Sequence, residues 1–142
     1  MTIAAILRSK GPEVLTIEAD TIVRDAVALL AERRIGALPV VRGGSVAGIM
    51  SERDVIYRLK SDGAAVLDWT VEQIMTAPAI TVEPDQQIMS ALSLMTKRRI
   101  RHLPVVEGGE IIGIVSIGDL VKYRMDKIEA DAAAMLEYIQ SV

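Results

Sequence analysis

The chain has 142 residues, 51% of them hydrophobic and none of them cysteine, so it can bury a core, while disulfides, thiolate metal sites and a cysteine nucleophile are excluded. Its formal net charge of −3 argues against a general electrostatic grip on nucleic acid. Because no apolar run approaches the roughly 18 residues of a membrane span and the first residues lack a secretory signal pattern, we expect a soluble, cytoplasmic protein.

The chain begins with a segment that we expect to be helical, followed by a strand and a second helix. Residues 16–18 predict the short strand. Asp20–Thr21 predicts the start of the next helix, and Gly36 can end it. One face of this helix is apolar, because the side chains that recur every three or four residues are Val23, Ala26, Val27, Leu30 and Ala31.

A β-hairpin and another helix follow. The apolar runs 38–41 and 46–50 are separated by Gly43–Gly44, a turn that can take positive φ, and this arrangement predicts two paired strands. Ser51 comes directly after the second run and predicts the cap of the next helix. Residues 60–68 contain Ser, Asp and Gly and are the best candidate for a linker.

The second half of the chain repeats the first. Residues 16–59 align without a gap with residues 81–124 at a shift of about 65, and roughly 18 of about 44 positions are identical. The same signals recur, with a strand at 81–83, a helix start at Asp85–Gln86 and a cap at Ser116. Each repeat is therefore a β-α-β-β-α unit.

The segments outside the repeats also carry information. Thr2–Leu7 echoes Thr70–Met75 with a slightly larger shift, so the first connector is longer. Residues 119–140 lack proline and glycine, and one helical face carries Ile128, Ala132, Met135 and Ile139. This terminal helix extends past the repeat, so its apolar face needs a partner.

These elements predict an α/β (α+β) fold of two tandem β-α-β-β-α units, each a small sheet covered by helices. A sheet of this size buries little alone, so we expect the units to pack about a pseudo-twofold axis. We assign the first repeat, with its N-terminal helical segment, to 1–62, a linker to 63–69, the second repeat to 70–126, and a terminal helix that contacts a second copy to 127–142.

Several short motifs occur twice in register. The run Arg-Ile-x-x-Leu-Pro-Val-Val occurs at 34–41 and 99–106, and each hairpin has a Gly-Gly turn. Gly-Ile-Met-Ser-Glu-Arg-Asp at 48–54 matches Gly-Ile-Val-Ser-Ile-Gly-Asp at 113–119, and Ile-Met-Thr occupies 74–76. On these motifs, which span nearly the whole chain, the sequence resembles the tandem cystathionine-β-synthase (CBS) domain proteins of the small bacterial stand-alone type.

The resemblance implies a regulatory module rather than an enzyme. A tandem pair of this family has two clefts for adenosine-containing ligands such as AMP, ADP, ATP, NAD(H) or S-adenosylmethionine. Two pairs usually join into a flat homodimer, and an effector protein outside this chain would read the ligand-dependent change of shape.

Carried onto this sequence, the resemblance assigns roles to residues of both repeats. Asp54 and Asp119 would bind the ribose hydroxyls, and Ser51 and Ser116 would lie near ribose or phosphate. A carboxylate can accept bonds from two vicinal hydroxyls, and a helix N-terminus offers backbone donors to phosphate. The adenine would lie between the entrance of a first strand and a second strand, where the candidates are Thr16, Ala37, Leu38, Pro39, Ile80, Thr81, His102, Leu103 and Pro104.

Several of these residues also have purely structural interpretations. A serine at a helix start with an acidic residue three positions later is a capping box, which applies to Ser51 with Asp54 and to the corresponding pair in the second repeat. Pro39 and Pro104 can mark strand edges. His102 is the single histidine, and such a residue is more often ordinary than catalytic.

Basic residues near the motifs differ in what they indicate. Arg98 and Arg99 are expected to form a solvated helix end, where cations favour the negative pole of the helix. Arg101 is a phosphate candidate because its counterpart in the first repeat is Gly36. Arg53 lies in a first helical turn, where the dipole disfavours a cation, so an anion explains it better. We therefore expect unequal clefts, with phosphate contacts from Arg53, Arg101 and His102.

A regulatory binding module is the function that the sequence favours. A nucleotide-processing enzyme would need a metal carboxylate cluster, a phosphate-cradling loop or a nucleophile with its base, and the sequence offers none of these patterns. An interaction scaffold with degenerate clefts stays open as an alternative. Nucleic-acid binding through residues 97–102 has little support, because aromatic residues are few and the net charge is negative.

Overall fold

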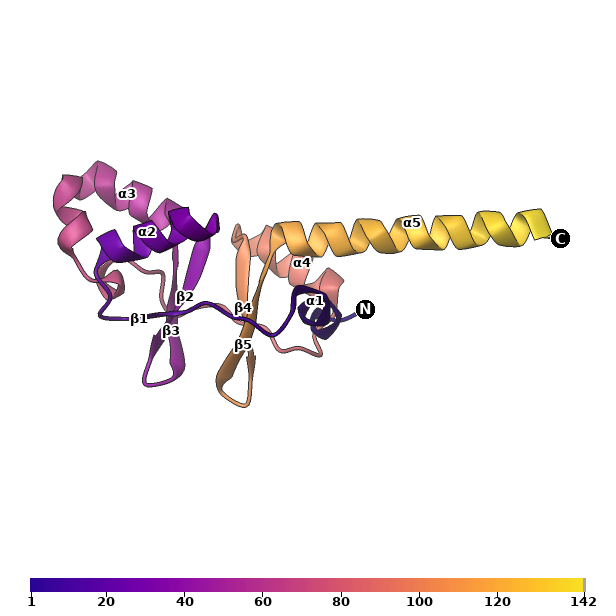
Figure 1. Cartoon of the computed structure of the whole chain (residues 1–142), viewed down its shortest axis with the longest axis horizontal. Helices are drawn as coiled ribbons and strands as arrows, with labels where there is room; N and C mark the ends of the chain where they lie inside the picture. The colour runs from indigo at the N-terminus through magenta and orange to yellow at the C-terminus, as the bar shows by residue number, and fades with distance from the viewer. Residues whose placement is uncertain (142) are drawn as a thin grey trace.

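The computed structural model describes residues 1–141, which form two similar halves side by side and a long terminal helix that projects from the second half (Figure 1). The first half contains β1 (Ile17–Glu18), α2 (Val23–Arg33), β2 (Ala37–Arg42), β3 (Ser45–Ser51) and α3 (Glu52–Asp62). The second half contains α4 (Ile88–Arg98), β4 (His102–Glu107), β5 (Glu110–Ser116) and α5 (Ile117–Ser141). This arrangement confirms the predicted mixed α/β fold of two tandem units with a C-terminal helix.

The two sheets differ in their first strand. In the first half, β1 pairs in parallel with β2, and β2 pairs with β3 in an antiparallel hairpin. In the second half, β4 and β5 form the hairpin, but the strand expected around Val82 is reduced to an isolated bridge with Val105. Pro84 explains the difference, because it lacks the N–H that its counterpart Ala19 donates to the carbonyl of Val41 over 3.0 Å.

Helices α2 and α4 begin later than their sequence signals. We expected Asp20–Thr21 and Asp85–Gln86 to start them, but the first helical residues are Val23 and Ile88. Neither helix has a side-chain cap bond at its N-terminus. The backbone N–H of Val23 donates to the carbonyl of Trp69 at 2.8 Å instead, and a distant chain segment bonds Ile88 in the same way. Tertiary contacts have replaced the local caps.

Gly36 does not end α2 as we expected. The helix ends at Arg33, and Arg34 takes the left-handed conformation with φ of 52°. Arg99 does the same at the end of α4 with φ of 55°. Gly36 is needed for space instead, because a Cβ at this position would lie 3.3 Å from Cε1 of His102.

The segments ahead of the two repeats are exchanged between the halves. Helix α1 (Ile3–Lys10) buries Ile3 and Ile6 in the core of the second half, although we assigned this segment to the first repeat. The short helix η2 (Val71–Gln73), ahead of the second repeat, buries Val71 in the core of the first half. Figure 1 shows α1 on the side of α4 and β5, far from α2. The exchange ties the halves into one folding unit.

The connector between the repeats is folded. A 3-10 helix, η1 (Gly63–Asp68), follows α3 directly. Its Val66 is fully buried in the core of the first half, and Leu67 and Trp69 pack against that core. The segment that we assigned as a linker therefore contributes apolar side chains to the first half.

The segments ahead of the two repeats, residues 2–10 and 70–78, are called the exchanged arms. Each arm crosses a glycine in the hairpin of the half against which it packs. A Cβ on Gly48 in β3 would lie 2.6 Å from the carbonyl oxygen of Thr76, and one on Gly113 in β5 would lie 2.6 Å from Cδ2 of Leu7. Ile49 and Thr76 exchange two backbone hydrogen bonds of 3.0 and 2.9 Å. Glycine at these positions thus lets each arm approach the strand that leads into α3 or α5.

Helix α5 is packed only near its start. Leu120 is fully buried, whereas the large apolar side chains exposed along the helix are Ile117, Val121, Met125, Ile128, Met135, Leu136, Tyr138 and Ile139. Figure 1 shows the C-terminal half of α5 projecting away from both halves. Within residues 1–141, no helix combines the length and the apolar character needed to cross a membrane.

Candidate ligand-binding clefts

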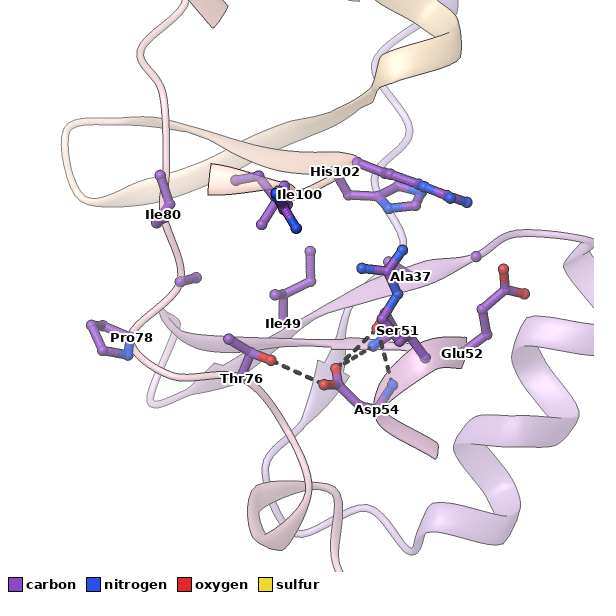
Figure 2. A pocket seen from close by; sticks show the side chains of 15 residues that line it. Ala37, Ile49, Ser51, Glu52, Asp54, Thr76, Pro78, Ile80, Ile100 and His102 are labelled. Atoms are coloured by element: carbon purple, nitrogen blue, oxygen red, sulfur yellow. Dashed lines mark hydrogen bonds between the residues drawn. The ribbon is translucent and has the colours of Figure 1, made fainter. Parts of the chain in front are cut away.

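Two clefts lie at the junction of the halves. The first cleft encloses about 860 Å³ of empty space, open solvent at its mouth included, and Figure 2 shows the side chains around it. Both halves build this cleft, since its lining residues are Gly36, Ala37, Ile49, Ser51, Glu52, Arg53, Asp54, Thr76, Pro78, Ala79, Ile80, Arg99, Ile100, Arg101 and His102.

The polar centre of the first cleft is the start of α3. The backbone N–H of Ser51 donates to Oδ2 of Asp54 at 2.8 Å, and the N–H of Asp54 donates to Oγ of Ser51 at 3.2 Å. The other carboxylate oxygen, Oδ1, accepts a bond of 3.0 Å from the hydroxyl of Thr76, as Figure 2 shows. Ser51 and Asp54 therefore form a capping box, which fixes the half-buried carboxylate of Asp54 at the wall of the cleft.

Apolar side chains form the opposite part of the first cleft. Figure 2 places Ile49, Ile80 and Ile100 around one space, with Pro78 at its edge. Branched apolar side chains on both sides of a narrow space can hold the faces of a flat ring. This part of the cleft is therefore suited to an aromatic base.

Pro104 explains why the chain leaves the sheet at Ile80. The segment is joined to β4 by two bonds, from Val82 N to the carbonyl of Pro104 at 3.0 Å and from Val106 N to the carbonyl of Val82 at 2.9 Å. Because Pro104 has no N–H, the ladder cannot extend back to the carbonyl of Ile80. That carbonyl accepts no backbone hydrogen bond from the described residues, and Ile80 itself lines the cleft.

Basic side chains surround the mouth of the first cleft. Arg53, Arg99 and Arg101 all line it, and none of the three forms a salt bridge with a carboxylate of residues 1–141. We expected Arg99 in a solvated helix end together with Arg98, but only Arg98 stays outside the cleft lining. Unpaired guanidinium groups beside a cleft can bind an anion with charge-assisted hydrogen bonds.

The second cleft lies on the other side of the junction and encloses about 1180 Å³, open solvent included. At the start of α5, Ser116 N donates to Oδ2 of Asp119 at 2.9 Å, and Asp119 N donates to Oγ of Ser116 at 3.1 Å, which repeats the cap of α3. The residues that line this cleft are Lys10, Glu13, Val14, Leu15, Arg33, Arg34, Ile35, Gly36, Ala37, His102, Ile114, Ser116 and Asp119.

Lys10 distinguishes the second cleft from the first. Its Nζ lies 2.8 Å from Oδ2 of Asp119 and donates to the carbonyl of Ile114 at 2.9 Å. Burial raises the pKa of Asp119, but the bonds from Lys10 and Ser116 outweigh burial and hold the pKa below its ordinary value. Asp54 has no comparable ion pair within the described chain.

His102 lies between the two clefts and lines both of them. Burial lowers the pKa of His102, and the positive charges of Lys10 and Arg101 add to this effect, while the carboxylates of Glu52 and Asp119 oppose it. The lowered pKa keeps the ring neutral at neutral pH. The ring can therefore offer one donor and one acceptor to a ligand, rather than a full positive charge.

The structure brings most of the candidate site residues to the clefts. Those that line the first cleft are Ala37, Ser51, Arg53, Asp54, Ile80, Arg101 and His102. The second cleft has Ala37, His102, Ser116 and Asp119. Each set combines a cap serine and aspartate with residues of both halves.

Six candidate residues lie outside the cleft linings. Leu38 and Leu103 are fully buried, because strand alternation turns them into the two cores. Pro39 and Pro104 are buried within β2 and β4. The remaining two, Thr16 and Thr81, each follow directly after a lining segment, at Val14–Leu15 and Pro78–Ile80.

Some lining residues were missed by the sequence reasoning. Thr76 belongs to the single Ile-Met-Thr motif, but its bond to Asp54 depends on the segment that crosses Gly48. Lys10 belongs to no recognised motif, and it reaches the second cleft only because α1 packs against the second half. A pattern read along one repeat cannot show a contact that depends on this exchange.

The groups in the first cleft define what it can do. A fixed carboxylate can accept hydrogen bonds from vicinal hydroxyls, the isoleucines can hold a ring, and the arginines can bind an anion. Among residues 1–141, no group of three or more His, Cys, Asp or Glu side chains is placed to hold a metal ion. These groups together could bind a small polar molecule that carries a flat ring.

Comparison with known proteins agrees with the repeat and the fold. The family model of the CBS domain matches residues 6–61 and 71–126. The chain is 36% identical to the mitochondrial CBS domain-containing protein CBSX3 of Arabidopsis thaliana, over 98% of this chain and 72% of that protein. A protein with CBS domains from Burkholderia ambifaria MC40-6 superposes with a TM-score of 0.83 at 43% identity, covering 89% of this chain and 95% of that one.

A second solved structure was determined with ligands bound. The CBS domain pair of protein MJ0100, in complex with 5′-methylthioadenosine and S-adenosyl-L-methionine, superposes with a TM-score of 0.79 at 26% identity. The match covers 89% of this chain and 98% of that one. With two matched domains and relatives aligned over nearly its full length, this chain belongs to the CBS-domain family as a tandem CBS pair.

Proposed function

We propose that this chain is a regulatory module that binds an adenosine-containing ligand in the first cleft and catalyses no reaction. The observation that carries the proposal is the position of Asp54. Its carboxylate is fixed by the cap of α3 and lies in a cleft that also holds three isoleucines and three arginines without carboxylate partners. A nucleotide presents the matching groups together, namely a vicinal diol, a flat base and a phosphate.

The proposed orientation of the ligand follows from these groups. The ribose hydroxyls donate to Asp54, and the base lies between Ile80 and Ile100. The carbonyl of Ile80 can accept a bond from the amino group of adenine, whereas guanine would present a carbonyl oxygen to it. The phosphate lies toward Arg53 and Arg101. This orientation favours adenine over guanine.

The relatives support the ligand class. The two molecules bound to the MJ0100 pair, 5′-methylthioadenosine and S-adenosyl-L-methionine, share an adenosine unit and lack a phosphate group. Recognition of adenosine at the ribose and base is consistent with both. The basic side chains at the mouth of the first cleft add a preference for a phosphorylated ligand in this chain, which makes AMP, ADP, ATP or NAD(H) the expected class.

Regulation follows from the construction of the cleft. Because both halves line it, a ligand that contacts both favours one relative placement of the halves and shifts the population toward it. A separate effector protein would read this change. The exposed apolar face of α5 is suited to a second copy of this chain in a homodimer, because it would otherwise leave several large side chains in water.

Thermal unfolding of nucleotide-free protein tests the proposal. Adenosine, AMP, ADP, ATP, NADH and S-adenosylmethionine are each added at millimolar concentration, with GMP as the control for base recognition. At about 100 times the Kd, a ligand that binds only the folded state adds about 2.7 kcal/mol of stability, so at least one adenosine ligand raises the melting midpoint. GMP raises it less.

A matched pair of variants assigns the effect to the cleft. Asp54→Asn keeps a side-chain oxygen that can accept the bond from Ser51 N but removes the carboxylate charge, and we expect it to lose most of the ligand-induced shift. Asp126→Asn makes the same chemical change on the exposed surface of α5 and retains the shift. If no ligand stabilises the wild-type protein, the clefts are degenerate, and the interaction scaffold becomes the better interpretation.

A further inference from the structure

We infer that Lys10 makes the second cleft the weaker nucleoside site, because its ammonium competes with the ribose of the ligand for the carboxylate of Asp119. This inference rests on the proposed function of the clefts. It assigns a specificity-determining role to a residue of the N-terminal arm, outside both repeated motifs.

The two aspartates have similar caps but different outer partners. Oδ1 of Asp54 accepts a bond from the neutral hydroxyl of Thr76 at 3.0 Å. Oδ2 of Asp119 accepts bonds from the ammonium of Lys10 at 2.8 Å and from Ser116 N at 2.9 Å, while Oδ1 has no hydrogen-bond partner among the described residues. A hydroxyl can rotate and accept a bond from an incoming group, whereas an ammonium has three donors and no acceptor. A neutral hydroxyl leaves the negative charge of Asp54 uncompensated, whereas the ammonium of Lys10 offsets the charge of Asp119, so Asp119 is the weaker acceptor for a ribose diol.

The contact of Lys10 is also anchored by a second acceptor. Its Nζ donates to the carbonyl of Ile114 at 2.9 Å, so two protein groups hold the ammonium in place. The side chains of Lys10 and Asp119 are 39% and 27% exposed, which leaves the pair partly shielded from water. A ribose that donates to Oδ1 of Asp119 therefore meets a carboxylate whose charge Lys10 offsets, and the weaker hydrogen bonds reduce the affinity of the ligand.

The positive charge that the arm contributes is found only in the second cleft. The arm Thr2–Leu7 corresponds to Thr70–Met75, and the same register places Pro78 opposite Lys10. Pro78 lines the first cleft but offers no charge and no donor. The inequality of the clefts thus arises from the exchanged arms as well as from the repeats.

Unequal affinities have a consequence for sensing. The first cleft fills at low ligand concentration, and the second fills only at a higher concentration. The chain can therefore respond over two separate ranges of ligand concentration.

Isothermal titration calorimetry with adenosine tests this inference. Adenosine is the probe because it has the ribose but no charge that could attract Lys10. The variant Asp54→Asn weakens the first cleft, so the remaining binding reports the second cleft. Adding Lys10→Met, which keeps the length of the side chain but removes its charge, tightens this binding by about fivefold or more, equivalent to about 1 kcal/mol.

Matched variants separate competition from a general effect. Lys10→Arg in the Asp54→Asn protein keeps the charge and leaves the binding weak. Lys10→Met in an Asp119→Asn protein leaves adenosine binding at the first cleft unchanged, because Lys10 does not line that cleft. Equal or weaker adenosine binding after Lys10→Met in the Asp54→Asn protein would overturn the inference. No adenosine or AMP binding by the wild-type protein would instead overturn the proposed function.

A second measurement avoids any substitution at Lys10. Salt weakens a partly exposed ion pair, while the binding of neutral adenosine depends little on salt by itself. In the Asp54→Asn protein, raising the NaCl concentration from 0.05 M to about 0.5 M therefore tightens adenosine binding. In the Asp119→Asn protein it has little effect. Salt-independent or weaker binding in the Asp54→Asn protein would contradict a role of Lys10 as a competitor.

Discussion

Replacing Gly48 by alanine should loosen the arm that carries Thr76 into the first cleft. The added Cβ would lie 2.6 Å from the carbonyl oxygen of Thr76 and 2.8 Å from Sδ of Met75. The sulfur can move because it lies near the end of a flexible side chain. The oxygen cannot move freely, because it accepts a hydrogen bond of 3.0 Å from Ile49 N, and Thr76 N returns one of 2.9 Å.

The size of the stability loss depends on which contacts the added methyl group disrupts. Two backbone hydrogen bonds contribute about 0.5–1.5 kcal/mol each, and overpacking by one methyl group costs about 1–3 kcal/mol. If the segment around Thr76 moves away, the hydrogen bonds are lost but the overpacking is relieved, so the two costs do not add in full. We therefore expect a loss of about 2–4 kcal/mol in the free energy of unfolding. For a chain of this size, that loss lowers the Tm by roughly 10 °C.

Two further alanine variants provide the controls in the same denaturation assay. A Cβ on Gly113 would meet the end of the Leu7 side chain rather than backbone, so this variant should lose less stability. A Cβ on Gly118 would lie 3.6 Å from Oγ of Ser116, an ordinary contact in the first turn of α5, and alanine there should stabilise the helix by up to about 1 kcal/mol. A Gly48→Ala protein as stable as Gly118→Ala would show that the close approach of Thr76 does not require glycine at position 48.

Three other predictions concern the cleft, its histidine and the terminal helix. Arg53→Ala and Arg101→Ala should each weaken AMP binding about tenfold and adenosine binding much less, and equal losses in calorimetry would contradict their role as phosphate contacts. Because burial lowers the pKa of His102, the unfolded chain binds more protons below about pH 6.5, so stability should fall as the pH drops through this range and His102→Gln should reduce the fall. Denaturant unfolding between pH 8 and pH 5 checks this, and identical pH profiles would contradict it. Ile128→Glu on the exposed face of α5 should convert a dimer into a monomer in light scattering, and an unchanged mass would argue against that face as the contact.

Local signals were sufficient for much of the fold. Gly43–Gly44 takes positive φ and joins β2 to β3, as a hairpin turn between two apolar runs predicts. Ser51 and Asp54 form the cap that their spacing indicates. Each of these features depends on residues within a few positions of one another, so the sequence pattern alone could identify them.

The features that sequence reasoning missed depend on contacts between distant segments. The start of α2 is displaced to Val23 because Trp69 supplies its hydrogen-bond acceptor. The strand at Val82 shrinks because Pro84 cannot donate to β4, although the repeat alone suggested equal sheets. Lys10 reaches Asp119 only through the exchange of α1, which no periodic pattern encodes.

Part of the candidate site could also be predicted from the sequence. The cap residues and the basic residues Arg53 and Arg101 could be read from differences between two aligned repeats. Leu38 and Leu103 were misplaced, because a repeated motif does not say which of its residues alternate into a core. Conversely, Arg99 lines the cleft, although its position at a helix end suggested only solvent exposure.

Calorimetry with two ligands and two proteins tests whether the carboxylate of Asp54 binds the ribose of an adenosine ligand. AMP and 2′-deoxy-AMP differ by one hydroxyl, and the wild-type protein should bind AMP about tenfold or more tightly than the deoxy form, as expected for a hydrogen bond to a charged group. In Asp54→Asn, both should bind weakly and with similar affinity. Equal affinities in the wild-type protein, or an undiminished preference for AMP in Asp54→Asn, would contradict the account.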